Sequence, residues 1–359
     1  AINALTGIQM ELIIIVSGCV IILYTVLGGM EAVIWTEVIQ AILKTIGALL
    51  ILGIITSQIG FADIITIGNR DAKFSLGSFQ PDMTTSSFWV ILAYGFFINL
   101  TNFGIDQNYI QRYHTAKNTQ DAAKSIWLCV AYYVPVSFLF FFIGTALYAY
   151  YDLNPTMIAE LKQQVSVEKN IPFEALKASD YGDRVLPFFM KTQIPKGLLG
   201  LLLAALLSAG MSTMSSGMNS SATVFLKDIY LRYVRPDLAP QKQLRVLLIS
   251  TIAMGCLGIV FGISMIGVKS LLDVWWKLSG IFAGGMLGIF LLGFLAKHVS
   301  NAAAKIAAVV GVLVIAWMSF KDVLPASYQS PLDSKLTVVV GTLSILFVGI
   351  SAQFWMKKR

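Results

Sequence analysis

The sequence contains little charge. Only 13% of its 359 residues are Asp, Glu, Lys or Arg, whereas 57% are hydrophobic. Soluble globular domains carry about 25% charged residues. The shortage of charge therefore excludes a disordered chain, a nucleic-acid-binding protein and an ordinary soluble enzyme. The mean hydropathy of +0.75 instead indicates a membrane protein.

Histidine and cysteine are also scarce. The two histidines, His114 and His298, lie in predicted loops, so no histidine-based metal cluster and no Ser–His pair can form within the membrane. Cys19, Cys129 and Cys256 lie inside apolar runs, where the expected role is that of a buried small hydrophobe. Their spacing fits neither a CxxC motif nor a disulfide framework.

Long apolar runs predict membrane helices. About 20 mostly apolar residues span a bilayer, and the backbone in lipid must satisfy its hydrogen bonds internally, so such runs fold as helices. The chain is therefore predicted to be an all-α, polytopic membrane protein with about nine transmembrane helices. They are expected at Ile8–Leu27, Val33–Ser57, Ser86–Ile105, Ala123–Tyr150, Gly197–Leu226, Val246–Met265, Ser270–Ala296, Ala302–Phe320 and Leu336–Met356.

The loops differ in charge, and this predicts an orientation. Basic segments such as Arg112–Lys124 and Lys227–Arg245 alternate with balanced or acidic ones such as Asp152–Lys196, in which short external helices are expected. Basic loops face the cytoplasm by the positive-inside rule. We therefore expect a multi-pass protein of the plasma (inner) membrane, with a cytoplasmic C-terminus and Ala1 on the outer side.

The fifth predicted span contains the richest polar cluster. Most of its polar side chains share one helical stripe, with Thr213 at the edge. Oxygen ligands without a nearby histidine or thiolate suit a hard cation such as Na⁺. An equally good interpretation is close helix packing, with the hydroxyls bonded to their own backbone. The cluster comprises Ser208, Ser212, Thr213, Ser215, Ser216 and Asn219.

Polar residues also lie within the second and third predicted spans. The segment from Asn99 to Gly104 predicts either a broken helix that lines a cavity or a helix that ends one turn earlier. Glu37 lies one turn into its span, with Lys44 two turns deeper on the same face. Glu37 is a candidate cation ligand, proton carrier or partner of Lys44. The alternative is that it snorkels to the cytoplasmic interface.

The seventh predicted span begins with tryptophans and continues with a glycine face. Trp275 and Trp276 either cap a substrate cavity or belong to an interfacial aromatic belt. Gly280, Gly284 and Gly288 recur at every fourth position and therefore share one face. Such a face predicts close helix packing.

Several segments together resemble the sodium/solute symporter family, which includes sodium-coupled galactose, sialic acid and monocarboxylate transporters. The matching pieces are Gly28–Gln40, Asp106–Arg112 and Ala204–Tyr230, and the similarity extends in order over essentially the whole chain. The resemblance implies a leucine-transporter-type inverted-repeat fold, present here in part. Family members have around 13 helices, so about four helices, including a broken helix that supplies sodium ligands, are expected to precede Ala1.

On this resemblance, residues 1–359 form a single transmembrane transport domain: the end of the first inverted repeat, the complete second repeat and two C-terminal helices. The resemblance also implies a principal sodium site made by the Ala209 carbonyl and the Ser212 and Thr213 hydroxyls. Its other ligands would come from the preceding broken helix.

A second sodium site of some relatives aligns with Glu37, Ser212, Ser215 and Ser216. The family usually has Asp where Glu37 stands, and the extra methylene moves the carboxylate. A structural or protonatable role for Glu37 therefore stays open beside the sodium site.

The resemblance assigns the substrate site to Asn99, Asn102, Phe103, Tyr133 and Trp276. Asn99 matches a sugar-contacting Asn of the galactose transporters. The other polar positions differ, since those transporters have Tyr, Lys and Gln where this chain has Asn102, Tyr133 and Trp276. Hydrogen-bonding groups with Phe103 as a stacking face suit a polyhydroxylated solute such as a sugar or sialic acid.

The predicted function is therefore sodium-coupled import of a small polar organic solute by alternating access, with a sugar or sialic acid favoured. A monocarboxylate or an amino acid is the alternative within the family. A membrane-embedded enzyme would need a nucleophile and a base in reach of each other, and the spans contain no histidine and no paired acids. A channel would need pore-loop or ring-forming motifs that the sequence lacks. The expected partners are Na⁺, a small-molecule substrate and the lipid bilayer, with no nucleic acid.

Overall fold

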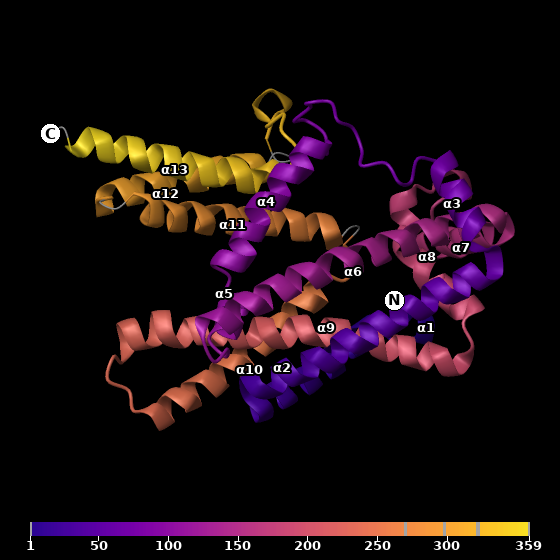
Figure 1. Cartoon of the computed structure of the whole chain (residues 1–359), viewed down its shortest axis with the longest axis horizontal. Helices are drawn as coiled ribbons and strands as arrows, with labels where there is room; N and C mark the ends of the chain where they lie inside the picture. The colour runs from indigo at the N-terminus through magenta and orange to yellow at the C-terminus, as the bar shows by residue number, and fades with distance from the viewer. Residues whose placement is uncertain (1, 269–270, 297–298, 321–323, 358–359) are drawn as a thin grey trace. The chain divides into compact units, whose positions relative to one another are not determined.

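The computed structural model describes residues 2–268, 271–296, 299–320 and 324–357. In these ranges the regular structure is helical (Figure 1). The first half contains α1 (Ile2–Thr6), α2 (Met10–Ile59), α3 (Phe61–Arg70), α4 (Phe88–Gly104), α5 (Gln107–Tyr113), α6 (Thr119–Leu153), α7 (Pro155–Lys169) and α8 (Ala178–Gln193). The second half contains α9 (Lys196–Val224), the π-helix η2 (Phe225–Val234), α10 (Pro240–Ser264), α11 (Leu271–Leu295), α12 (Asn301–Ser319) and α13 (Leu336–Lys357).

The predicted membrane helices are confirmed. Within the described residues, 8 helices are long and apolar enough to cross a membrane, or up to 9 if the bent pair α4 and α5 counts as one span. Eight of the nine predicted spans fall on these helices, and the third, Ser86–Ile105, falls on the bent pair. The short helices predicted between Asp152 and Lys196 are also present, as α7 and α8.

A glycine kink separates the first two spans, Met10–Gly29 and Glu31–Ile59, which together form α2. Gly29 has φ 58° and ψ −155°. Only glycine adopts this region without strain because a Cβ would collide with the backbone. The Gly-Gly pair in the sequence therefore marks the turn between two membrane crossings.

One of the two compact units of the chain comprises residues 1–74 and 115–269. In it α2 packs against α6, α9 and α10. Its apolar core lies where the ends of α2 and α6 meet α3, α7 and α8, around Ile55, Ile64, Leu161 and Phe189, all at most 2% exposed. This core anchors the C-terminal end of α2, whereas Glu37 lies near the start of the second span, Glu31–Ile59.

The other unit comprises residues 75–114 and 270–359, with α11, α12 and α13 packed side by side and α4 against α11 and α13. The predicted glycine face of α11 lies against α13. A Cβ added at Gly284 would lie 3.1 Å from the Cα of Val338, and one at Gly288 would lie 2.8 Å from the Ile345 side chain. The packing interpretation of these glycines is thus confirmed.

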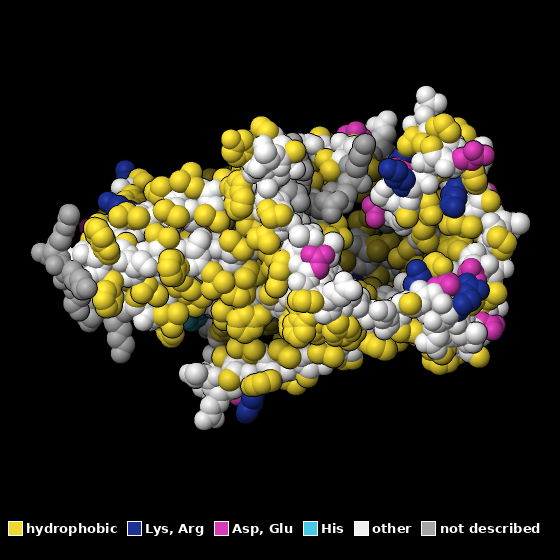
Figure 2. Space-filling view, turned by 90° about the horizontal axis from the view of Figure 1, so that it is seen from above, with side chains coloured by type: hydrophobic (Ala, Val, Ile, Leu, Met, Phe, Trp, Pro, Cys, Tyr) yellow, Lys and Arg dark blue, Asp and Glu magenta, His cyan; other side chains and the backbone are white. Residues whose placement is uncertain are grey.

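Charge gathers at one end of the first unit. Figure 2 shows hydrophobic side chains over much of the visible face, whereas Lys, Arg, Asp and Glu cluster over α3, α7 and α8. There Arg70 contacts Asp71 and Asp152, and Arg184 pairs with Glu168. The Arg184 guanidinium lowers the pKa of the Glu168 carboxyl by hydrogen bonding to it. Helix α3, which the sequence did not predict, belongs to this charged end.

The cysteines differ from expectation. Cys19, Cys129 and Cys256 are free thiols, as their spacing predicts, but they are exposed on the helix surfaces rather than buried. The prediction of burial was wrong because a small apolar side chain on a membrane helix can face lipid as readily as another helix. His114 lies in the turn after α5, and His298 lies outside the described residues.

Replacing Gly29 by alanine is expected to destabilise the complete protein by about 1–3 kcal/mol, because alanine is strained at this φ and ψ. The measurement is thermal unfolding in detergent. Gly53→Ala is the matched control, since Gly53 lies in the same helix, has no neighbour within 4 Å of an added Cβ and has no positive φ. Equal melting temperatures for the two variants would contradict the strain expected for alanine at the Gly29 kink.

Candidate cation site

Two polar contacts of the first unit join the second span of α2 to α9, and these two helices run antiparallel. Glu37 on α2 contacts Ser216 on α9, and Lys44 contacts Ser212, one turn earlier on α9. Further along α2, Gly47 lies against Leu202. Residues later in α2 thus contact residues earlier in α9. The small Gly47 lets the two helices approach closely.

The three atoms predicted for the principal sodium site converge on one turn of α9. The Ala209 carbonyl oxygen accepts hydrogen bonds from the Ser212 hydroxyl at 3.0 Å and from the Thr213 hydroxyl at 3.2 Å. Thr213 is exposed, while Ala209 and Ser212 are half-buried. The turn therefore presents three hard oxygen atoms on an accessible side, and this donor set fits Na⁺.

Both interpretations of the polar stripe are compatible with this geometry. The serine and threonine hydroxyls do bond to their own helix, as the packing interpretation predicts; Ser208 bonds in the same way to the Ala205 carbonyl at 2.9 Å. A hydroxyl donates one hydrogen and retains two lone pairs as acceptors. The Ser212 and Thr213 oxygens can therefore bond to the backbone and still accept from a cation.

The residues predicted for a second sodium site are arranged differently. The Ser216 hydroxyl donates to the Glu37 carboxylate, but the Ser215 hydroxyl donates to the Ser212 carbonyl of its own helix at 3.2 Å. The Lys44 ammonium donates to the Ser212 hydroxyl at 3.4 Å. A cationic group thus lies beside Ser212, and the second sodium site stays a prediction.

The third predicted span is broken, as the polar segment suggested. Helix α4 ends at Gly104, α5 begins at Gln107, and their axes bend by 48°. The Asp106 carboxylate caps α5 by accepting a hydrogen bond from the Asn108 backbone N–H at 2.7 Å. Because Asn99 and Asn102 still lie within α4, the alternative that the helix ends one turn earlier was wrong.

The predicted substrate residues fall on both units. In the second unit, Asn99 donates to the Gly95 carbonyl at 2.7 Å, and the ring of Phe103 lies 5.0 Å from that of Tyr109. Asn102 is half-buried on the same helix. The predicted residue Trp276 has the Lys335 ammonium 4.4 Å from its ring centroid. Tyr133 belongs to α6 of the first unit, and 63% of it is exposed.

Two tyrosine contacts near the site were not predicted. The Tyr24 hydroxyl donates to the Met211 carbonyl on α9 at 3.2 Å, and the Tyr132 hydroxyl lies 2.5 Å from the Thr45 hydroxyl on α2. Each joins two helices of the first unit. The feature of the sequence that could have indicated these contacts was a tyrosine hydroxyl within an apolar run.

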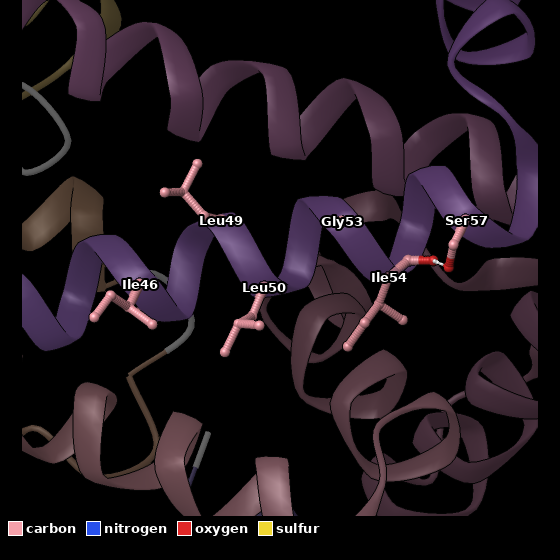
Figure 3. Close-up of a pocket in the computed structure, with 6 residues that line it drawn as sticks. All are labelled: Ile46, Leu49, Leu50, Gly53, Ile54 and Ser57. Carbon is pink, nitrogen blue, oxygen red and sulfur yellow. Dashed lines mark hydrogen bonds between the residues drawn. The ribbon is translucent and has the colours of Figure 1, made fainter.

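A groove on α2 lies beyond Lys44 and differs from the polar contacts (Figure 3). It has a volume of about 330 Å³ and is lined by Ile46, Leu49, Leu50, Gly53, Ile54 and Ser57, all from one helix. The Ser57 hydroxyl donates to the Ile54 carbonyl at 2.8 Å. The lining offers no charged group, so the groove suits a lipid chain better than an ion or a polar solute.

Comparison with known proteins identifies the family. Residues 1–311 match the model of the sodium:solute symporter family. The chain belongs to this family. The resemblance described from the sequence is therefore confirmed.

Individual symporters are similar over nearly the whole chain. The sodium/sialic acid symporter NanT of Aliivibrio fischeri is 29% identical over 93% of this chain and 63% of its own length. The sodium/sialic acid symporter SiaT of Proteus mirabilis is also 29% identical, over 97% of this chain and 66% of its own. The chain thus spans just under two thirds of these relatives.

A solved structure is similar too. It is the substrate-bound, outward-open state of a Na⁺-coupled sialic acid symporter, with a TM-score of 0.83, 27% identity and coverage of 98% of this chain and 68% of that one. The predicted all-α membrane fold of leucine-transporter type is confirmed by this similarity.

Replacing Ser216 by alanine is expected to lower the stability of the complete protein by about 1–3 kcal/mol, because the half-buried Glu37 carboxylate loses a hydrogen-bond donor. Thermal unfolding in detergent measures the change. Ser57→Ala is the control, since Ser57 is exposed on α2 and bonds only within its own helix among the contacts described. If both variants melt alike, the Glu37 contact contributes nothing to the α2–α9 pair.

Proposed function

We propose that the protein is a sodium-driven symporter that imports a sialic-acid-like solute across the plasma membrane by alternating access. The observation that carries the proposal is the convergence of Ala209, Ser212 and Thr213 on one accessible turn of α9, in a chain of the sodium:solute symporter family. In this proposal residues 1–359 belong to one transport domain, with the end of the first inverted repeat, the complete second repeat and two C-terminal helices. Basic loops face the cytoplasm and Ala1 the outside.

In this proposal Na⁺ is the co-transported ion, and its electrochemical gradient drives uptake of the solute. At a membrane potential of about −100 mV, one inward Na⁺ contributes roughly 2.3 kcal/mol, to which its concentration gradient adds. Na⁺ can shift the conformational equilibrium only if it binds one state more tightly than the other. The exposed side of Thr213 allows this, because further ligands can reach the ion in one state and leave it in another.

Two observations support the proposed substrate class. Two of the relatives that resemble this chain are named as sodium/sialic acid symporters. The substrate residues expected here also carry amide, phenol and indole groups, which hydrogen-bond hydroxyls and stack on sugar rings. They are Asn99, Asn102, Phe103, Tyr133 and Trp276.

Alanine in place of Ser212 or Thr213 is expected to reduce sodium-dependent uptake of sialic acid at least 10-fold in the complete protein, because each change removes a cation ligand. The measurement is uptake of labelled sialic acid into proteoliposomes with an inward Na⁺ gradient. Thr223→Ala is the control, because Thr223 bonds to its own helix in the same way as Thr213, with 2.8 Å to the Asn219 carbonyl, but lies outside the proposed ligand set.

Unchanged sodium dependence in both ligand variants would contradict the site. The substrate is tested in the same liposomes by adding unlabelled competitors. Unlabelled sialic acid should abolish uptake of the label, while galactose, pyruvate and amino acids should leave most of it. Stronger competition by any of these three would overturn the substrate class and leave the sodium site standing.

A further inference from the structure

A cluster of polar contacts joins the beginnings of three helices in the second unit. Ser86 lies just before α4, Lys335 lies just before α13, and Trp276 lies in the second turn of α11. The Lys335 ammonium donates to the Ser86 hydroxyl at 2.9 Å and lies 3.8 Å from the Asp333 carboxylate. The Ser86 hydroxyl in turn donates to Asp333 at 2.8 Å. One cation, one anion and one hydroxyl thus bond to one another.

The charged groups of this cluster are largely withdrawn from water. The side chain of Lys335 is 11% exposed and that of Asp333 is 12% exposed. A charge so far from solvent depends on its protein partners. Asp333 is itself fixed by the backbone, since its N–H donates to the Met83 carbonyl at 2.9 Å and its carboxylate accepts from the Lys335 N–H at 2.9 Å. The position of the ammonium is therefore well defined.

The ammonium lies over the Trp276 ring. Its distance of 4.4 Å from the ring centroid is within the range of cation–π attraction, which is strongest for tryptophan and increases when the cation is desolvated. Gly280, one turn further along the same face of α11, lies against α13, because an added Cβ would be 3.2 Å from the Cβ of Thr337. Close packing of α11 on the start of α13 thus brings the indole to the ammonium.

The contact restricts the indole. Trp276 is half-buried, so part of its surface is accessible to a solute. An indole on a helix end turns about two side-chain bonds, and fixing it only when a ligand arrives costs free energy of binding. An ammonium held over one face fixes the plane of the ring and the direction of its Nε1–H donor beforehand. The ring is thus oriented before any solute binds.

We propose that Lys335 is a positioning residue of the substrate site: its ammonium, held by Ser86 and Asp333, orients the Trp276 indole for contact with the solute. The inference rests on the proposed function, which assigns Trp276 to that site. In the proposed orientation α4, α11 and α13 all begin on the outer side of the membrane. The oriented indole therefore lies toward the side from which the solute enters.

A double-mutant cycle between Lys335 and Trp276 tests the inference by equilibrium binding of labelled sialic acid to the purified complete protein in saturating Na⁺. Lys335→Gln is expected to raise the Kd about 10-fold, because glutamine can bond to Ser86 but places no charge over the ring. Trp276→Leu is expected to raise the Kd at least as much. The double variant should bind no more weakly than Trp276→Leu alone, since a residue that acts through the indole has no effect once the indole is removed.

Two further variants separate orientation of the ring from general damage. Lys335→Arg should stay within about 2-fold of the wild-type Kd, because a guanidinium also binds over aromatic rings. Lys162→Met is the matched control and should keep the wild-type Kd. It removes an ammonium 5.1 Å from the Tyr181 ring, on α7 and α8, which contain no predicted substrate or sodium residue. Na⁺ binding without solute should be equal in all these variants.

Each other result decides the question. A loss of affinity in Lys335→Gln that persists in the Trp276→Leu background would mean that Lys335 acts independently of the ring, and would overturn the inference. So would a wild-type Kd in either single variant, or a Lys335→Arg variant as weak as Lys335→Gln. These results would leave the sodium symport intact.

No binding of sialic acid by the wild type would contradict the proposed function itself, and the inference would fall with it. If Lys335→Gln does not fold or loses Na⁺ binding, Ser86→Ala takes its place in the cycle, because it removes the hydroxyl that holds the ammonium. An unchanged Kd in Ser86→Ala would then overturn the inference.

Discussion

The contact between α2 and α9 is the interaction on which the account of this protein depends. Two groups that are normally charged, Glu37 and Lys44, lie on a membrane-length helix and reach hydroxyls of the helix packed against it. Charged groups within a membrane are costly unless they are paired with a partner. The contacts of Glu37 with Ser216 and of Lys44 with Ser212 meet this need at two points along α9.

The register gives one turn of α9 two sides with different chemistry. The buried serines face the covered side, where hydroxyls meet the charged groups of α2. The Ala209 carbonyl and the Thr213 hydroxyl belong to the other side, and Ser212 takes part in both. A hydroxyl can serve both sides because it donates once and accepts twice. The Ser212 hydroxyl thus links Lys44 on α2 to the Ala209 carbonyl on α9.

Much of this arrangement could be predicted from the sequence. The membrane helices follow from the length of apolar runs, because lipid forces the backbone to bond internally. The break between the first two spans follows from the end of one apolar run at Leu27 and the start of the next at Val33, and the close packing of α11 follows from its glycine spacing. The resemblance to the symporter family implied the three principal ligand atoms, and helix spacing explains only why they are close, because residues three and four apart are neighbours.

Other features needed the tertiary structure. Helix α3 is short, and its position depends on packing at the charged end. Exposure of the cysteines could not be inferred, because an apolar residue in a membrane helix is equally compatible with lipid or protein contact. The contact of Lys44 with Ser212 was missed because it joins residues that are 168 positions apart. Only the helix pairing makes them neighbours.

The most direct test of the central claim is an experimental structure of the complete protein in NaCl, at a resolution that places ions. The account predicts one Na⁺ within coordination distance of the Ala209 carbonyl and the Ser212 and Thr213 hydroxyls, with the Lys44 ammonium still beside Ser212. An ion held by Glu37 and Ser216, with none beside Ala209 and Thr213, would contradict it.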